Sequence, residues 1–312
     1  MRTAPAVALM LSSGPVRAPV RQSARSPDLT AMLLQRVVTA LVLLLLIAGA
    51  LLSASAWPFA VLTLALITAA AWEWGRLNQA PAAVAWAMGA LVAGAGAGAL
   101  WAQWAAPAAS GVSAWWWAAV SLWVLGGAVA LRTGPTAWPL LPRVARWLLG
   151  GVGLWGAWLA LVQAHALGVN FVLSVLALVW AADIAAYFGG RRLGRRKLAP
   201  AISPGKSWEG VWSGVVGVLL LAGSWLLLDR AYGFDGPSLY TRLVQSLGWA
   251  GTLLALLFLA AMSVVGDLVE SLVKRAAGAK DSSRLLPGHG GVLDRVDALL
   301  PVLPLSLALL SM

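Results

Sequence analysis

The sequence predicts an all-α, polytopic integral membrane protein with about 8 to 9 transmembrane helices and a polar cavity that faces the cytoplasm. Three observations carry this prediction. Of the 312 residues, 61% are hydrophobic and only 11% are charged, whereas soluble domains carry about 25% charged residues. The mean hydropathy is +0.84. The apolar residues are also grouped in runs of about 20, the length that crosses a bilayer as a helix.

The first part of the chain differs from the rest in composition. Residues 1–31 are rich in Arg, Ser, Ala and Pro, contain one acid, Asp28, and show no sustained apolar periodicity. We interpret them as a disordered leader, with a composition also typical of transit peptides. Met32 precedes a long apolar run and is an alternative start, in which case the leader is not translated. We expect N-terminal transmembrane helices over 32–180 and a C-terminal transmembrane region with the polar motifs over 181–312.

Eight apolar runs are long enough to span a membrane. They lie at about 37–55, 57–75, 82–102, 113–131, 147–166, 168–188, 210–228 and 247–266. A ninth run, 298–312, is short and contains two prolines, which predicts a partial span. Two glycine pairs with GxxxG spacing, Gly94 with Gly98 and Gly210 with Gly214, predict close helix packing.

Lysine and arginine are concentrated in segments that these spans place on one side of the membrane. With the N-terminus in the cytoplasm, that side holds the N-terminal segment and the loops 76–81, 132–146, 189–209 and 267–297. These segments contain 20 of the 22 Lys and Arg residues. Because cytoplasmic loops are enriched in these residues, the pattern predicts the orientation. The net charge of +11 then reflects membrane topology, and we expect no nucleic-acid partner.

The residue types present restrict the kind of metal site that the chain can build. No cysteine is present, and the two histidines are His165 and His289, so thiolate sites and histidine-rich cages are excluded. A metal must be held by carboxylates. Carboxylate and water ligands favour Mg²⁺ over zinc or copper.

The end of the eighth run carries polar residues at helical spacing. Ser263, Asp267, Glu270, Ser271 and Lys274 recur every three or four residues and share one helix face. A carboxylate at a membrane edge is a candidate functional group. The alternative for Asp267 is an interfacial acid paired with Lys274.

Asp294 and Asp297 follow the turn "PGHGG" at the expected start of the last helix. Asp267 and Asp294 flank one loop, so we expect them to meet at one membrane surface and share a Mg²⁺ ion, which also takes water and substrate phosphates. The alternative is that Asp294 and Asp297 only complement the helix dipole. Asp229 falls on the opposite side, and we expect its replacement by asparagine to be nearly silent.

The glycines of the turn suggest a site for an anion. Gly288, Gly290 and Gly291 allow backbone N–H groups to approach a phosphate, and His289 could bind phosphate or orient an aspartate. The alternative for His289 is a polar turn residue. Asp183 and Tyr187 lie one turn apart at the end of the sixth run and can face the same cavity; the alternative for Asp183 is an ion pair with a neighbouring arginine.

The segment "SPGKSWEG" (203–210) contains a partial phosphate-loop pattern. That pattern needs a glycine five residues before Gly205, where Pro200 stands, and we expect no strand before it. Ser203, Lys206 and Ser207 still suit the phosphate of a nucleotide or lipid. The basic cluster at 191–197 has an alternative role as a topology anchor or an anionic-lipid contact.

The run "SLVKRAAGAKDSSRLLPGHGGVLDRVDALLP" (271–301) closely resembles the C-terminal signature of the phosphatidate cytidylyltransferases, also called CDP-diacylglycerol synthases. The segments "GDLVES" (266–271), "AADIAAYFGGRRLG" (181–194) and "SPGKSWEG" also resemble motifs of that family. The resemblance covers about 181–301, while the N-terminal half resembles the family only in its hydrophobic profile. Gly205 stands where a lysine is common and Ser207 where a threonine is common.

The resemblance implies transfer of a cytidylyl group from CTP to phosphatidic acid, with Mg²⁺ as cofactor and a second cation as an addition whose identity the sequence does not show. It implies Asp267 and Asp294 as metal ligands. The further catalytic residues expected are Lys274, His289 and Arg295. The expected substrate-binding residues are Asp183, Tyr187, Ser203, Lys206, Ser207, Lys280, Asp281, Gly288, Gly290, Gly291 and Asp297.

The expected location is a bacterial plasma (inner) membrane, with the catalytic loops in the cytoplasm, the lipid bilayer as a partner, and a homodimer as an open alternative to a monomer. The rival function is an ion-coupled transporter in which Asp183 and Asp267 are the coupling residues. Inverted repeats or paired broken helices would favour the transporter, and neither is visible in the sequence.

Overall fold

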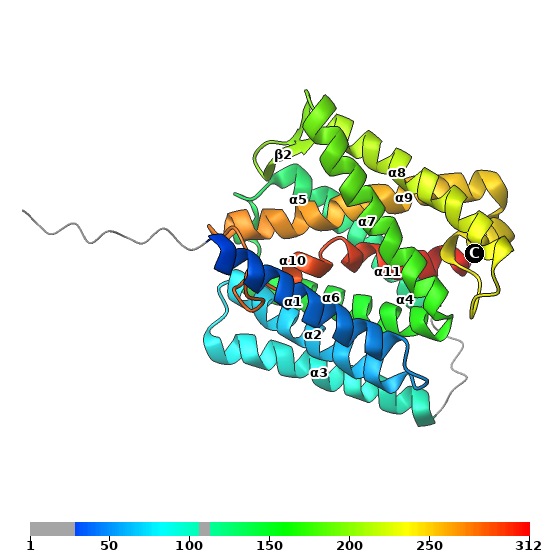
Figure 1. Ribbon diagram of the computed structural model, residues 1–312. Helices are drawn as coiled ribbons and strands as arrows, with labels where there is room; N and C mark the ends of the chain where they lie inside the picture. The colour runs from blue at the N-terminus through cyan, green and yellow to red at the C-terminus, as the bar shows by residue number, and fades with distance from the viewer. Residues whose placement is uncertain (1–28, 106–112) are drawn as a thin grey trace, which may run out of the picture.

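The computed structural model describes residues 29–105 and 113–312, most of which are helical (Figure 1). Of the predicted leader, only its last three residues fall within this range, where they begin the first helix. In chain order the elements are α1 (Leu29–Leu51), α2 (Trp57–Leu77), α3 (Ala82–Ala105), α4 (Ser113–Ser121), the π-helix η1 (Leu122–Gly126), α5 (Gly127–Thr133), the 3₁₀-helix η2 (Trp138–Leu140), α6 (Arg143–Ala166), α7 (Val169–Leu193), β1 (Lys197–Ala199), β2 (Ser203–Ser207), α8 (Trp208–Ala231), α9 (Leu239–Ala276), α10 (Leu293–Val296) and α11 (Leu299–Leu310).

The structure confirms the predicted all-α polytopic membrane class. Within the described residues, 7 helices are long and apolar enough to cross a membrane, and they coincide with the second to eighth expected runs. For the first expected run, the described apolar stretch is Val37–Leu51. The ninth forms α11, which has 12 residues. At 1.5 Å per residue this is about 18 Å, less than the roughly 30 Å thickness of the hydrocarbon layer.

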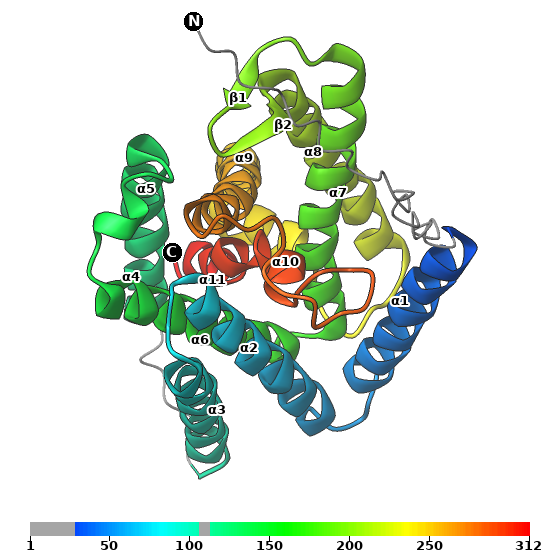
Figure 2. The same cartoon turned by 90° about the vertical axis from the view of Figure 1, so that its left-hand side faces the viewer.

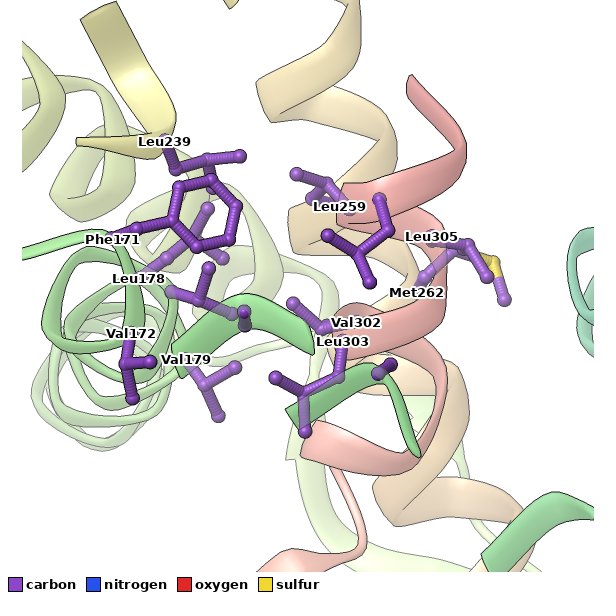
Figure 3. Packing of buried hydrophobic residues seen from close by; sticks show 14 of the residues in the cluster. Phe171, Val172, Leu178, Val179, Leu239, Leu259, Met262, Val302, Leu303 and Leu305 are labelled. Atoms are coloured by element: carbon purple, nitrogen blue, oxygen red, sulfur yellow. The ribbon is translucent and has the colours of Figure 1, made fainter. Parts of the chain in front are cut away.

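Helix α11 lies inside the bundle, where it packs against α4, α6 and α9. Figure 2 shows it in the middle of the surrounding helices. Val302 and Leu305 are fully buried, and Figure 3 shows them facing Leu259 and Met262 of α9, with side chains of α7 on the other side. The last helix is therefore the core of the bundle.

Helices α7 and α8 approach each other closely through small residues. A Cβ atom added at Gly210 would lie 3.0 Å from the carbonyl oxygen of Ala186, and one at Gly214 would lie 2.9 Å from that of Ala182. The packing predicted for this glycine pair is confirmed. For Gly94 and Gly98 it is wrong, because a Cβ at either position meets no heavy atom of another part of the protein within 4 Å.

The loops expected on the cytoplasmic side lie together at one end of the bundle. Figure 1 shows β2, α10 and the C-terminal ends of α2 and α9 at the left, and the α8–α9 connection at the right. Hydrogen bonds join the loops at the left-hand end: Trp138 Nε1 donates to Asn78 Oδ1 at 2.8 Å, and Arg275 Nε to the carbonyl of Ile202 at 3.3 Å. We call this the loop end of the bundle.

A polar cluster joins α7, α8 and α9 at the opposite end. The carboxylate of Asp229 accepts hydrogen bonds from Asn170 Nδ2 at 2.9 Å, from Ser238 N at 3.0 Å, and from the hydroxyls of Ser238 and Thr241, both at 2.5 Å. Asp235 accepts hydrogen bonds from the first two backbone N–H groups of α7. The side chain of Asp229 therefore ties three helix ends together. Its replacement should affect stability, while the expectation that the replacement is nearly silent in activity stays a prediction.

We expect Asp229→Asn to lower the melting temperature of the detergent-solubilised protein. The amide keeps one acceptor oxygen and turns an N–H₂ donor toward groups that are themselves donors. Leaving partly buried donors unsatisfied costs about 1–3 kcal/mol. Thermal unfolding followed by circular dichroism measures the change, with Ser246→Ala, an exposed hydroxyl that bonds only within its own helix, as the control. A melting temperature equal to that of the wild type would contradict the role given to Asp229.

Candidate active site

A cavity of about 440 Å³ opens at the loop end between α7, α8, α9 and strand β2. Its polar lining residues are Asp183, Tyr187, Arg191, Ser203, Lys206, Ser207 and Asp267. Its apolar lining includes Val215 on α8 and Ala260 and Val264 on α9. Val264 and Ala260 precede Asp267 by about one and two helical turns, so the polar groups lie at the mouth and the apolar wall extends toward the bundle centre.

The hairpin β1–β2 places Lys206 in this cavity. The strands pair antiparallel, with Lys197 opposite Ser207, and Ser207 then caps α8 by accepting a hydrogen bond from Gly210 N at 3.2 Å. The expectation that no strand precedes this motif is wrong: β1 precedes it and β2 contains it. The carboxylate of Glu209 supports the preceding loop by accepting hydrogen bonds from Arg195 N at 3.0 Å and Arg196 N at 3.1 Å.

Lys206 and Asp267 form an ion pair in the cavity. Each side chain is about a quarter exposed, so the pair is partly shielded from water. Asp183 is close enough to interact electrostatically with both of them, and Ser271 Oγ donates to Asp267 at 3.2 Å. The cavity mouth therefore holds two carboxylates and one ammonium group from three different elements.

A second charged group lies around Lys274. Its Nζ is 2.6 Å from Glu270 Oε2 and 2.7 Å from Asp294 Oδ1. Asp294 also accepts hydrogen bonds from Ser282 N and Oγ, each at 2.9 Å, and from Gly291 N at 2.8 Å. Burial alone would raise the pKa of Asp294, but hydrogen bonds from Lys274, Gly291 and Ser282 outweigh it and lower the pKa to about 2. Asp294 is thus a firmly held anion.

Asp297 lies between the two groups. Its backbone packs against α9, because a Cβ added at Gly266 would be 2.5 Å from the carbonyl oxygen of Asp297. Burial, and after it the charge of Asp267, raises the pKa of Asp297 to about 7. Its side chain also interacts electrostatically with Lys206 and Lys274. Asp297 therefore links the cavity mouth to the Lys274 group.

The loop 286–291 folds back on itself. Leu286 N donates to the carbonyl of Gly290 at 2.8 Å, and Gly288 and Gly290 have φ values of 74° and 82°, a region that glycine adopts without steric cost. The carbonyl of His289 accepts two hydrogen bonds from the guanidinium of Arg295. This is a turn that glycine makes possible, as expected.

The backbone N–H groups that follow this turn bind carboxylates of the protein itself. Gly291 N donates to Asp294, while Val292 N and Leu293 N donate to the carboxylate of Glu73 at 3.0 and 2.7 Å. A phosphate is therefore not required to satisfy the N–H group of Gly291, for which the sequence predicts contact with an anion. A phosphate-binding role for Gly288, Gly290 and His289 stays a prediction.

Comparison with known proteins identifies the family. A family model described as the cytidylyltransferase family matches residues 34–312. The chain belongs to the cytidylyltransferase family. This match includes every element described above except the first turn of α1.

Individual members of the cytidylyltransferase family resemble the chain over a shorter part. A phosphatidate cytidylyltransferase of Pseudomonas aeruginosa is 44% identical over 170 residues, which are 53% of this chain and 58% of that protein. One of Haemophilus influenzae is 47% identical over 137 residues, 44% of each protein. One of Bacillus subtilis is 39% identical over 145 residues, 46% of this chain and 49% of that protein. The chain matches about half the length of these relatives.

Some of the predicted site residues of this cytidylyltransferase family member share the cavity and others do not. The structure brings Asp183, Tyr187, Ser203, Lys206, Ser207 and Asp267 together there, with Tyr187 Oη accepting from Arg191 Nη1 at 3.2 Å. Lys274 and Asp294 form the neighbouring group, and Arg295 bonds to the turn. Lys280 and Asp281 are exposed on the loop after α9.

Two acids that position loops escaped the sequence analysis, namely Glu73 and Glu209. Glu73 is the only acid in the first five apolar runs, and a lone carboxylate within an apolar helix is itself a signal of function. Glu209 is the first acid of a helix, where dipole complementarity is a sufficient explanation.

Proposed function

We propose that the chain transfers the cytidylyl group of CTP to phosphatidic acid and so forms CDP-diacylglycerol and pyrophosphate. The observation that carries this proposal is the identity of 39–47% to phosphatidate cytidylyltransferases of three bacteria. The amphipathic cavity supports it, since the substrates are a polyanionic nucleotide and a lipid. Neither the family nor these relatives support the transporter alternative.

The cavity offers groups for both substrates. Lys206 and Arg191 at the mouth can bind phosphate oxygens, and the apolar wall of Val215, Ala260 and Val264 suits the acyl chains. An oxygen of the lipid phosphate attacks the α-phosphorus of CTP, so that one O–P bond forms. The bond between the α-phosphorus and the bridging oxygen breaks, and pyrophosphate leaves with that electron pair.

The carboxylates fit the expected Mg²⁺. Asp267 and Asp294 each contact a lysine ammonium, so each faces a position that a cation occupies. Within the described residues, no three Asp, Glu or His side chains converge on one metal position. This suits Mg²⁺, which takes few protein carboxylates and completes its shell with water and substrate phosphates. We propose Asp267 and Asp294 as its ligands; when bound, the ion offsets phosphate charge.

An assay on purified protein tests this function. Pyrophosphate should be released only when CTP, phosphatidic acid and Mg²⁺ are all present, and a lipid product should carry radiolabel from the nucleotide. A detergent-solubilised sample has no second compartment, so turnover in it also excludes transport as the origin of the signal. Absence of product from folded protein under these conditions would contradict the proposal.

We further propose that the loop end faces the cytoplasm of a bacterial plasma membrane. The concentration of Lys and Arg in the loops at this end supports the orientation. Single cysteines introduced into this cysteine-free chain can test it at exposed positions. We expect Gly233→Cys to react with an impermeant thiol reagent added to intact cells, and Ala201→Cys and Ala277→Cys to react only after permeabilisation. Labelling of either alanine site from outside would reverse the orientation.

A further inference from the structure

Glu73 of α2 is fully buried, yet four hydrogen bonds from one distant loop converge on its carboxylate. Ser283 Oγ donates to it at 2.5 Å, Ser282 Oγ at 3.2 Å, Val292 N at 3.0 Å and Leu293 N at 2.7 Å. These donors are more than 200 residues away along the chain. A buried carboxylate is costly unless it is well hydrogen-bonded, so the loop and Glu73 satisfy each other.

Hydrogen bonding, rather than ion pairing, satisfies this carboxylate. In the part of the chain that the structure describes, no lysine, arginine or histidine forms an ion pair with Glu73. Two acceptor oxygens serve four donors, which a carboxylate can do and an amide cannot. A simple charge-pairing role for Glu73 is therefore inconsistent with its surroundings.

Helix α2 is held rigidly behind Glu73. Trp74 Nε1 donates to the carbonyl of Arg146 at 2.8 Å, and the backbone carbonyl of Asn78 accepts from Trp147 Nε1 at 3.1 Å. Trp74 also meets Trp138 edge to face, with ring centroids 6.0 Å apart. The part of α2 that carries Glu73 is thus fixed by contacts with α6 and η2, none of which involves the loop that Glu73 binds.

The same loop orders the charged groups of the site. Ser282 lies between Glu73 and Asp294, with its Oγ 3.2 Å from Glu73 Oε2 and 2.9 Å from Asp294 Oδ2, and the two carboxylates share its single hydroxyl proton. Asp294 in turn holds Lys274. Gly291 closes the contact, because a Cβ there would lie 2.0 Å from Ser282 Oγ and 2.5 Å from Glu73 Oε1. Direct contacts therefore connect Glu73 of α2, through Ser282, to Asp294.

We propose that Glu73 is a positioning residue that fixes segment 282–293, and through it Asp294 and Lys274, in the arrangement the reaction requires. This inference deepens the proposed function and rests on it. Glu73 itself does not line the cavity. It acts as an anchor supplied by the N-terminal helices to a site whose recognisable motifs all lie in the C-terminal part of the chain.

The rate of limited trypsin digestion reports how firmly Glu73 holds the loop, and it does not depend on enzymatic activity. Arg284 is an exposed cleavage site on the loop, and Arg195 is an exposed site on the other loop, so cleavage after Arg195 serves as an internal reference. We expect Glu73→Gln to speed cleavage after Arg284 at least about tenfold, since several hydrogen bonds that hold the loop are lost, and to leave cleavage after Arg195 unchanged. Glu73→Asp, which keeps both oxygens, should lie between the two.

The matched control is Glu209→Gln, because Glu209 also holds a loop by accepting backbone hydrogen bonds, from Arg195 and Arg196, with an added ion pair to Arg196. It should speed cleavage after Arg195 and not after Arg284. If Glu73→Gln fails to fold and all sites are cut, Ser283→Ala removes one donor and keeps the carboxylate. It should then give a smaller, selective increase after Arg284. Unchanged cleavage after Arg284 in folded Glu73→Gln, or in Ser283→Ala where it replaces that variant, would overturn the proposal.

Activity gives the second readout. Supporting partners of a functional group typically contribute 10–100-fold, so kcat of Glu73→Gln should fall by about that factor, with partial recovery in Glu73→Asp. A kcat equal to that of an active wild type would overturn the positioning role. If the wild type itself makes no CDP-diacylglycerol, the proposed function fails, whereas the digestion result still decides whether Glu73 anchors the loop.

Discussion

Replacing Asp267 with asparagine should reduce turnover at saturating CTP by on the order of 10³-fold, the loss typical of one missing transition-state contact. Asn keeps the size of the side chain but removes the charge that pairs with Lys206 and that would bind Mg²⁺. The Mg²⁺ concentration required for half-maximal activity should rise as well. Initial rates of pyrophosphate release across a Mg²⁺ titration measure both effects.

Asp229→Asn is the matched control, because it is the same substitution at the opposite end of the bundle. It should lower stability and preserve the specific activity of the folded protein. Asp267→Asn should instead lower the specific activity and leave the stability close to that of the wild type. Normal turnover by folded Asp267→Asn would rule out the assignment of Asp267 to the reaction.

Asp294→Asn should also reduce turnover by about 10³-fold. Asparagine has no negative charge, so the ion pair with Lys274 is lost. It also has one acceptor oxygen in place of two, and its NH₂ group turns a donor toward Ser282 or Gly291. If Asp267 and Asp294 share one ion, the double variant should be little worse than the worse single variant, since residues that act as a unit are not additive. The comparison requires kcat for both single variants and the double variant.

Losses that multiply in the double variant would contradict a shared ion. They would leave Asp294 with the role that its contacts already describe, which is to fix Lys274 and the loop. Normal turnover by well-folded Asp294→Asn would exclude both roles.

The transmembrane organisation could be predicted because the bilayer demands a fixed length of apolar helix. The location of α11 was harder to predict. Pro304 and a length of 12 residues argue against a membrane span, but they do not indicate where in the protein the helix lies. Its position inside the bundle depends on contacts with four helices, which no local pattern contains. The β1–β2 hairpin was missed because its five-residue strand contains a proline and a glycine, both depleted in strands.

The candidate site could be predicted where each residue lies at the expected loop end of an apolar run or in a recognisable motif, even though the residues come from different elements. Asp183, Lys206 and Asp267 do share a cavity. The partnership of Asp294 could not be predicted, because Lys274 and the Ser282 and Gly291 backbone compete for its oxygens and only the loop conformation decides between them. Glu73 could not be linked to that loop at all, since a contact across more than 200 residues leaves no trace in local spacing.

The central position of α11 has a consequence for biosynthesis. The ribosome makes α4, α6, α7 and α9 before α11, and all four surround it. These helices can be inserted into the membrane one after another, but they cannot close on one another until α11 has been added. Since α11 is too short to be inserted as an independent span, it packs between helices that are already in the membrane, and its apolar side chains complete the core. Assembly of the bundle should therefore be a late, post-insertion event, and a nascent chain stopped before Leu299 should remain open and accessible to proteases.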